Sequence, residues 1–314
     1  MKKKMYSLAI RKRLNENDFF WNHSDYEFVE CKIDCGSRYW LADPFLFEWG
    51  NKVFLFYEAF DLYENKGKIG YSIYNEDEKT FSPPQIIISE KYHMSFPFIF
   101  SKGEEIYIMP ESCGDYSVHL YRAQSFPKKW ERDSIILPDV YACDSVLLEK
   151  DNKSFIIASE MYHNVPCEQY SSCWVKNRLY KLDGFSVKDE GIKVAEGDFG
   201  IRNAGKIFID NGKCFRIGQD CRGKQYGRGL VLFEIESLEP YSEKEIWHTD
   251  FKEIGSHIVR DNRCDILGAH TYNFCSKYEI IDYSRMAPYS KLTAIRRTIT
   301  MIKNGAKYLS RVKI

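Results

Sequence analysis

The sequence lacks the features that mark membrane-spanning, nucleotide-binding and nucleic-acid-binding proteins. It has no apolar run of about 18 residues, so no stretch is long enough to cross a bilayer as a helix. It has no P-loop, no dinucleotide-binding fingerprint and no low-complexity linker. Its 45 basic and 45 acidic residues cancel, which removes any overall attraction to nucleic acid. We therefore expect no nucleic-acid partner, and nothing in the sequence calls for a cofactor.

Signals for export, disulfides and metal binding are also missing. Ten cysteines are present, but no C-x-x-C pair occurs and no spacing matches a zinc site, so we predict no metal-binding site. The apolar stretch Met5–Ile10 within the basic N-terminus is too short for a signal peptide. We therefore expect a cytoplasmic protein with reduced thiols, most of them small residues of the core.

What the sequence does contain is apolar β-structure. The stretches Leu41–Glu48 and Lys52–Ala59 read as two strands rich in aromatic and β-branched residues, joined by a turn at Gly50-Asn51. In an antiparallel hairpin the start of the first strand lies beside the end of the second. Asp43 and Glu58 are therefore expected to be neighbours at the open end of this hairpin.

The same hairpin pattern recurs four more times along the chain. The later turns are predicted at Lys102-Gly103, Asp151-Asn152, Asn211-Gly212 and near Cys275-Ser276. Their spacing of about 50 to 60 residues matches one four-stranded propeller blade. We predict an all-β fold, a five-bladed β-propeller. An open all-β array or a sandwich is the alternative.

The two ends of the chain extend this pattern in different ways. The fifth unit shows only two clear strands, so residues 1–37 are expected to supply its outer strands and to close the ring. The propeller itself is predicted over residues 38–283. The polar and aromatic insert Tyr162–Trp174 is expected to form either a rim loop over the axial opening or an ordinary surface loop.

The composition changes after the propeller. Residues 283–314 contain eight Lys or Arg and no Asp or Glu, and apolar residues recur every three or four positions from Leu292 to Leu309. This spacing predicts a basic amphipathic helix over residues 284–314. Residues 285–314 have two expected positions. They either lie on an anionic membrane surface, which would make the protein peripheral on the inner face of the membrane, or dock on the propeller with the apolar face of the helix inward.

Polar side chains stand at the same end of every hairpin. They are Asp43 with Glu58, His93 and Phe96 with Glu111, Asp144 with Glu160, Arg202 with Gln219 and Asp220, and His270 with Asp282. In a propeller these strand ends converge around the central axis, so we predict one shared site, to which the polar run after Asp220 adds Tyr226. Each residue taken singly has an ordinary explanation, such as a glutamate that caps a strand or a histidine that is satisfied within the core.

Carboxylates, histidines, an arginine and aromatic side chains in one funnel suit a sugar. Carboxylates accept hydrogen bonds from hydroxyl groups, aromatic faces cover the apolar side of a pyranose, and Arg202 can bind an anionic substituent or a phosphate. Glycoside chemistry needs one carboxylate that activates the attacking oxygen and a second, protonated carboxyl that donates to the leaving oxygen. We therefore predict a sugar or oligosaccharide substrate, which a nucleotide or a lipid could carry.

Short motifs at these positions resemble the five-bladed glycoside hydrolase superfamily, which includes families 43, 32, 62 and 68 and the mannoside phosphorylases of family 130. The motifs are Asp43-Pro44-Phe45, Ser95-Phe96-Pro97-Phe98, Pro110-Glu111-Ser112 and Asp144-Ser145-Val146. A closer resemblance is to the propeller region that precedes the transferase domain of glucosamine inositolphosphorylceramide transferases, and to stand-alone bacterial relatives associated with surface-polysaccharide loci. It rests on Arg202-Asn203-Ala204-Gly205, Gln219-Asp220, Tyr226-Gly227 and Gly268-Ala269-His270-Thr271.

The resemblance implies roles for individual residues. Asp43 corresponds to the aspartate that serves as general base in the hydrolases, and Asp144 resembles a later aspartate that tunes pKa values and orients the sugar. Glu111 is the candidate for the general acid, followed by Glu160 and Glu58. The predicted catalytic residues are thus Asp43, Glu111 and Asp144, and the predicted substrate-binding residues are Glu58, His93, Glu160, Arg202, Gln219, Asp220, Tyr226 and His270.

Three functions fit this sequence. The first is an enzyme that makes or breaks a glycosidic bond, by glycosyl transfer in the assembly of surface polysaccharide or glycolipid. The second is a hydrolase or phosphorylase of the family 43 or 130 type that acts on cytoplasmic oligosaccharides. The third is a non-catalytic glycan-binding or scaffold propeller. The chain departs from family 43 at Phe96-Pro97, where that family places an aspartate, and although some relatives hold an axial calcium, no ligand set here demands one.

Overall fold

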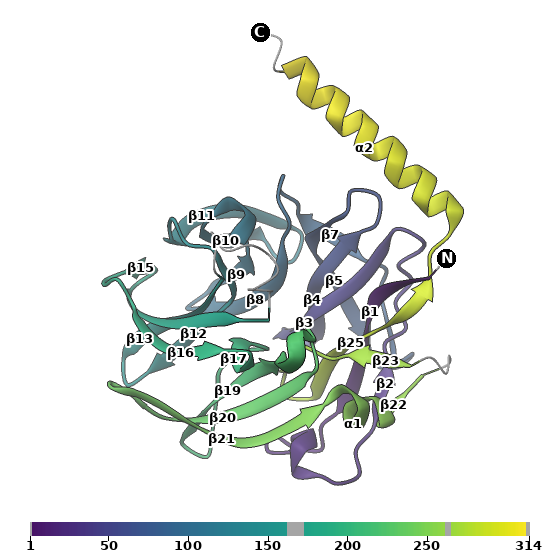
Figure 1. The fold of residues 1–314 in the computed structure, drawn as a ribbon. Helices are drawn as coiled ribbons and strands as arrows, with labels where there is room; N and C mark the ends of the chain where they lie inside the picture. The colour runs from purple at the N-terminus through teal and green to yellow at the C-terminus, as the bar shows by residue number, and fades with distance from the viewer. Residues whose placement is uncertain (1, 162–172, 261–264, 312–314) are drawn as a thin grey trace.

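The computed structural model describes residues 2–161, 173–260 and 265–311. The insert predicted at Tyr162–Trp174 lies almost wholly outside the described residues. Figure 1 shows five sheets arranged around a common centre, with a single long helix that leaves them near the N-terminus. The predicted five-bladed β-propeller is therefore confirmed, and the open array and the sandwich are excluded.

Each of the first four sheets is built from consecutive strands. Blade one contains β3 (Tyr39–Trp49), β4 (Lys52–Asp61), β5 (Lys66–Asn75), β6 (Thr80–Phe81) and β7 (Gln85–Ile88). Blade two contains β8 (Ser95–Lys102), β9 (Glu105–Glu111), β10 (Val118–Ser125) and β11 (Lys129–Leu137). Blade three contains β12 (Ala142–Lys150), β13 (Lys153–Met161), β14 (Val175–Asp183), β15 (Ser186–Val187) and β16 (Ile192–Gly197). Blade four contains β17 (Phe199–Asn203), β18 (Phe208–Asp210), β19 (Lys213–Asp220), β20 (Gly229–Leu238) and β21 (Tyr241–Asp250).

The fifth sheet is assembled from both ends of the chain. It contains β23 (Ile266–Gly268), β24 (Tyr272–Phe274) and β25 (Tyr278–Pro288) from the C-terminal part, with β1 (Lys2–Lys12), β2 (Phe28–Glu30) and β22 (Ile258–Val259) outside them. Strand β1 is antiparallel to β25 over its full length, from Lys2 opposite Pro288 to Lys12 opposite Tyr278. The N-terminal segment thus supplies the outer strands of blade five, and blade five then meets blade one.

Short helical segments connect some strands. They are the 3-10 helices η1 (Phe20–Asn22), η2 (Cys113–Asp115) and η3 (Arg222–Lys224), and the helix α1 (Phe251–Ser256). Asp250 caps α1, because its carboxylate accepts hydrogen bonds from the backbone N–H groups of Lys252 and Glu253. Among the described residues every cysteine is a free thiol, and six of the eight are buried.

The hairpins follow from local sequence chemistry. The first hairpin turns at Gly50, whose φ of 58° belongs to the left-handed region that glycine adopts without cost. Consecutive residues along most of β3 and β4 are buried, because both faces of the blade are covered by its neighbours, as in the edge-to-face contact of Phe45 with Phe96 at 4.9 Å. We call the end of the propeller at which β3 starts and β4 ends the site end, and the opposite end the turn end.

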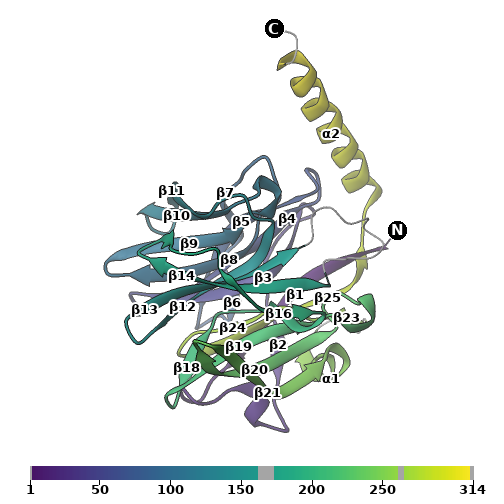
Figure 2. The ribbon, with the colours of Figure 1, turned by 60° about the vertical axis from the view of Figure 1, so that its left-hand side comes forward.

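The C-terminal helix α2 (Lys291–Arg311) projects from the site end and away from the sheets in both views (Figures 1 and 2). Strand β25 continues to Pro288, so residues 284–288 belong to blade five and the helix begins later than predicted. The helix does not dock with its apolar face inward, because Leu292 and Ile302 keep 56% and 66% of their surface exposed. Among the described residues no helix combines the length and the apolar character needed to cross a membrane.

The role of β1 generates the first prediction. Deletion of residues 2–12 removes the strand that pairs with β25 and uncovers Leu8 and Ala9, which are buried. We expect the melting temperature to fall by roughly 10 °C or more, or cooperative unfolding to disappear, because several buried apolar groups are lost at once. Deletion of residues 297–314, which keeps the contacts of Thr293, Ala294 and Arg296 with the propeller, is the control and should leave the melting temperature almost unchanged. Equal effects of the two deletions in circular dichroism melts would contradict this role of β1.

Candidate active site

The inner strands of the first three blades share a distortion at the site end. Asp43, Phe96 and Asp144 have φ values of 50°, 44° and 43°, and the strand ladder skips register at each of them. Residues other than glycine rarely adopt this left-handed conformation, and in native proteins such strain gathers at functional sites. The bulges let Asp43 and Asp144 bond to residues of neighbouring blades instead of continuing their own ladder.

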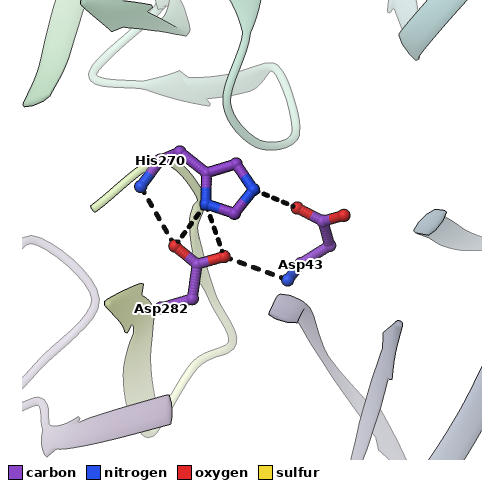
Figure 3. Close-up of side chains that lie close together, drawn as sticks. All are labelled: Asp43, His270 and Asp282. Atoms are coloured by element: carbon purple, nitrogen blue, oxygen red, sulfur yellow. Dashed lines mark hydrogen bonds and ion pairs between the residues drawn. The ribbon is translucent and has the colours of Figure 1, made fainter. Parts of the chain in front are cut away.

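The first cluster joins blades one and five and contains Asp43, His270 and Asp282 (Figure 3). The His270 ring places Nε2 3.1 Å from Asp43 Oδ1 and Nδ1 2.9 Å from Asp282. Asp43 also accepts a hydrogen bond of 2.7 Å from the Thr271 hydroxyl and one of 3.2 Å from the backbone N–H of Phe96. The imidazole is thus held between two buried carboxylates that lie on different blades.

This arrangement shifts two pKa values in opposite directions. Burial alone would lower the pKa of His270, but the negative charges and hydrogen bonds of Asp282 and Asp43 raise it to about 10. Burial alone would raise the pKa of Asp43, but the positive charge and hydrogen bond of His270, the Thr271 hydroxyl and the Arg202 charge lower it. At neutral pH the structure therefore contains a charged imidazolium beside an ionised Asp43.

The second cluster joins blades two, three and four. The buried Arg202 donates through Nε to Asp144 and forms an ion pair with Glu111, whose Oε2 lies 3.3 Å from an Arg202 Nη atom. Gln219 donates from Nε2 to Asp144 at 3.0 Å, and the Cys113 thiol lies 3.3 Å from the other oxygen of Glu111. Two carboxyl groups therefore share one guanidinium, and all three side chains are buried.

The two carboxyl groups of this cluster hold protons more tightly than usual. Burial and the negative charge of Asp144 raise the pKa of Glu111 to about 8, against the opposing charge of Arg202. Burial also raises the pKa of Asp144, although Arg202 opposes that shift. The two side chains hydrogen-bond to each other, so at neutral pH Glu111 carries a proton that it can donate.

A third group, Glu58 with His93, borders both clusters. Burial and the charge of Asp43 raise the pKa of Glu58 well above its ordinary value, whereas burial lowers the pKa of His93. Nδ1 of His93 accepts a hydrogen bond from the backbone N–H of Gly67, so the proton of the neutral ring sits on Nε2, 3.4 Å from Glu58. Gly67 is required here, because an added Cβ would lie 2.5 Å from a Glu58 oxygen.

Two tyrosines complete the site. The Tyr226 ring lies 5.0 Å from the His270 ring and 5.1 Å from the Arg202 guanidinium, so it links the first two clusters. The Tyr6 ring lies 4.7 Å from His270 on another side. We call the three clusters with these two tyrosines the axial site. Sequence reasoning missed Tyr6, because β1 lies far from the hairpins in the chain, and it missed Thr271, although Thr271 directly follows His270.

Comparisons with known proteins identify the family. Residues 30–263 match the family described as glucosamine inositolphosphorylceramide transferase 1, N-terminal. The chain belongs to this family. It is 34% identical over 244 residues to glucosamine inositolphosphorylceramide transferase 1 of Oryza sativa subsp. japonica. The aligned region covers 76% of this chain and 32% of that protein. The protein of the same name from Arabidopsis thaliana is 32% identical over 209 residues, which covers 66% of this chain and 27% of that protein.

The chain thus spans about a third of the length of these relatives. Solved structures support the fold of this N-terminal family. A thermostable family-43 glycoside hydrolase superposes with a TM-score of 0.55 at 10% identity, over 82% of this chain and 92% of that chain. A family-43 β-xylosidase/α-arabinofuranosidase from a compost microbial metagenome gives a TM-score of 0.54 at 10% identity, over 80% and 92% of the two chains.

The structure does not bring Glu160 or Asp220 into the axial site. Glu160 instead contacts Lys176, Arg178 and Tyr180, all on the next strand of blade three. The reason is that Glu160 stands one residue further along its strand than Glu111 does. In blade two Ser95 pairs with Glu111, but in blade three the equivalent residue Cys143 pairs with Ser159. Because side chains alternate between the two faces of a strand, this shift turns Glu160 away from the axis.

Asp220 is buried, but its carboxylate is paired with arginines outside the axial site. Its two oxygens accept hydrogen bonds from the Arg222 side chain at 3.0 and 2.9 Å, and Arg228 lies 3.6 Å away. The guanidinium of Arg202, predicted to bind an anionic substituent, instead compensates Asp144 and Glu111. Its charge therefore tunes these carboxyl groups.

The carboxylates of the axial site could in principle attract a metal ion. Within the described part of the chain two groups have suitable spacing, Asp43 with His270 and Asp282, and Glu111 with Cys143 and Asp144. Both ring nitrogens of His270 already face carboxylates, and burial raises the pKa of the Cys143 thiol well above its usual value. Calcium prefers six to eight oxygen ligands, but the first group contains the positively charged His270 and the second is paired with Arg202. The residues of the axial site therefore do not fit a calcium ion.

The protonated Glu111 gives a prediction on stability. A carboxyl whose pKa is raised by folding, here from 4.5 to about 8, stabilises the folded protein at low pH, and this contribution is lost as the pH rises through that interval. We expect the Glu111→Gln variant to lose less stability than the natural protein between about pH 5 and pH 8. Chemical unfolding at several pH values measures the slope. Glu104→Gln, which removes an exposed carboxylate, is the control, and an unchanged slope in Glu111→Gln would refute the assignment.

Proposed function

We propose that the axial site binds a sugar and makes or breaks a glycosidic bond, by glycosyl transfer in the assembly of glycolipid or surface polysaccharide. One observation carries the proposal. Within a single buried site the pKa of Asp43 is lowered and the pKa of Glu111 is raised to about 8. Two carboxyl groups whose environments separate their pKa values form the acid and base that this chemistry requires.

The proton transfers follow from these protonation states. Glu111 donates its proton to the glycosidic oxygen as the bond to the sugar breaks. Asp43 accepts a proton from the attacking hydroxyl group or water as the new bond forms. Asp144 and Arg202 set the proton affinity of Glu111, and the protonated His270 keeps Asp43 ionised. The faces of Tyr6 and Tyr226 offer surfaces against which a sugar ring can pack.

Family membership guides the choice of substrate. The relatives are named as transferases that act on inositolphosphorylceramide, but this chain spans only about a third of their length. We therefore propose a sugar that is carried on a nucleotide or a lipid, and a reaction at the cytoplasmic surface of a membrane. The basic helix α2 beside the site end supports this location.

A second function has its own support. Both oxygens of Asp43 already accept hydrogen bonds within the protein, from Thr271 and from the backbone of Phe96. The part of the relatives that this chain does not match is about two thirds of their length. A non-catalytic propeller that binds a glycan for a separate transferase is therefore the alternative.

Substitution of the two carboxyl groups tests the enzymatic proposal. We expect Asp43→Asn and Glu111→Gln each to lower turnover by roughly a hundredfold to ten-thousandfold, because each removes a proton transfer. Products from nucleotide-linked, lipid-linked and free oligosaccharide substrates are followed by mass spectrometry, which separates transfer from hydrolysis and from phosphorolysis.

The control for these variants is Glu160→Gln, which removes a carboxylate outside the axial site and should keep full turnover. Turnover that persists in Asp43→Asn would exclude this site as the catalytic centre. Glycan binding by calorimetry that occurs without turnover in the natural protein would establish the alternative.

A further inference from the structure

The two ends of the chain meet beside the axial site. Lys2, Lys3 and Lys4 on β1 pair with Pro288, Ala287 and Met286, the last residues of β25 before the helix α2. The Lys3 ammonium lies 4.2 Å from the centre of the Tyr289 ring. Figure 1 shows the N-terminus next to the start of α2. Three lysines that are almost 290 residues from α2 in the sequence therefore lie on the strand beside its base; Lys3 faces Tyr289, and Lys4, on the other face of the strand, lies 5.6 Å from the centre of the Tyr6 ring.

The base of α2 is fixed to the propeller. Thr293 is buried and its hydroxyl pairs with that of Ser290, while Arg296 donates a hydrogen bond of 2.8 Å to the Tyr63 hydroxyl. Ala294 packs against the apolar cluster that contains Tyr289. This first turn sets the direction in which the rest of the helix leaves the blade.

The exposed part of α2 has two different faces. Leu292, Ile295, Ile299 and Ile302 follow helical spacing and form one apolar stripe, and each keeps 46% to 66% of its surface exposed. Lys291 and Lys303 lie beside this stripe, whereas Arg296 is bonded to Tyr63, and no acidic residue occurs in residues 283–314. Met301 is equally exposed but lies on the opposite face of the helix.

Aromatic contacts connect this surface to the axial site. The cluster at the base of α2 includes Trp40 and Phe60, whose rings stack at 4.5 Å. The Phe60 ring lies 6.1 Å from His93, and the Trp40 ring lies 5.4 Å from Tyr6. A single aromatic ring, Phe60 or Trp40, therefore lies between the base of α2 and the axial site, which it contacts at His93 or at Tyr6.

We propose that Lys2, Lys3 and Lys4 together with the apolar stripe and basic residues of α2 form one surface that binds an anionic lipid bilayer and holds the site end of the propeller against it. Lysines near such a surface are attracted to its charge, and an apolar stripe enters the boundary between headgroups and acyl chains. A second copy of the chain fits this surface poorly, because two such helices would bring only positive charges together. The proposal concerns the placement of the site and is independent of the reaction that occurs there.

Vesicle flotation of the full chain tests the surface. We expect binding to phosphatidylcholine vesicles that contain phosphatidylserine, and little binding to phosphatidylcholine alone. Replacing Lys2, Lys3 and Lys4 together with Glu should weaken binding roughly tenfold or more, as should Ile299→Asp combined with Ile302→Asp. Met301→Asp is the matched control, because it adds a charge at an equally exposed position on the other face, and it should weaken binding least.

Three results would overturn the proposal. The first is no binding of the full chain to anionic vesicles, and the second is an equal loss of binding in Met301→Asp and in the stripe variant. The third is a dimer in sedimentation experiments that the stripe variant dissociates, because the stripe would then bind a second copy. If the stripe variant melts at a lower temperature than the natural protein, Ile295→Asp is tested in its place, because it changes the same stripe one turn closer to the propeller.

The orientation is tested separately by tryptophan fluorescence. Trp40 and Trp49 lie at opposite ends of β3, at the site end and the turn end. Brominated lipids quench tryptophans that approach the bilayer, so quenching should fall in Trp40→Phe and stay unchanged in Trp49→Phe. The reverse result would place the turn end against the membrane and would overturn the orientation.

Discussion

The structure depends on the balance of charge that is buried on the axis of the propeller. Among the described residues, five carboxyl groups meet there and two cationic side chains pair with them. The carboxyl groups are those of Asp43, Glu58, Glu111, Asp144 and Asp282, and the cations are His270 and Arg202. Burying a charge without a partner is costly, so the remaining carboxyl groups must keep protons. The raised pKa values of Glu58, Glu111 and Asp144 meet this requirement, and the same requirement makes an acid available for chemistry.

The backbone and this charge balance support each other. Each cation is shared between blades: His270 joins blade five to blade one, and Arg202 joins blade four to blades two and three. The left-handed conformations of Asp43 and Asp144 direct their carboxylates to these partners, and the ion pairs in turn offset the strain of the bulges. A ring of five sheets therefore brings together groups that no single blade could hold at this spacing.

The sequence predicted the architecture well, because hairpins are local. Turn residues between apolar runs rich in aromatic and β-branched residues predicted all five hairpins, and the regular spacing of the turns indicated the ring. The limit was register: an offset of 15 residues from Asp43 to Glu58 and of 16 from Asp144 to Glu160 looks almost the same in a sequence, yet the extra residue sends Glu160 to the opposite face. Partners from distant strands, such as Tyr6 beside His270, carry no spacing signal at all.

The pairing of β1 with β25 has a consequence for synthesis. Strand β1 can pair only after residues near 288 have been synthesised, and the strands of blades one to four all lie between β1 and β25 in the chain. The axial ion pair between His270 and Asp43 can form only at that last step. Synthesis of residues up to about 288 therefore precedes the completion of the axial site.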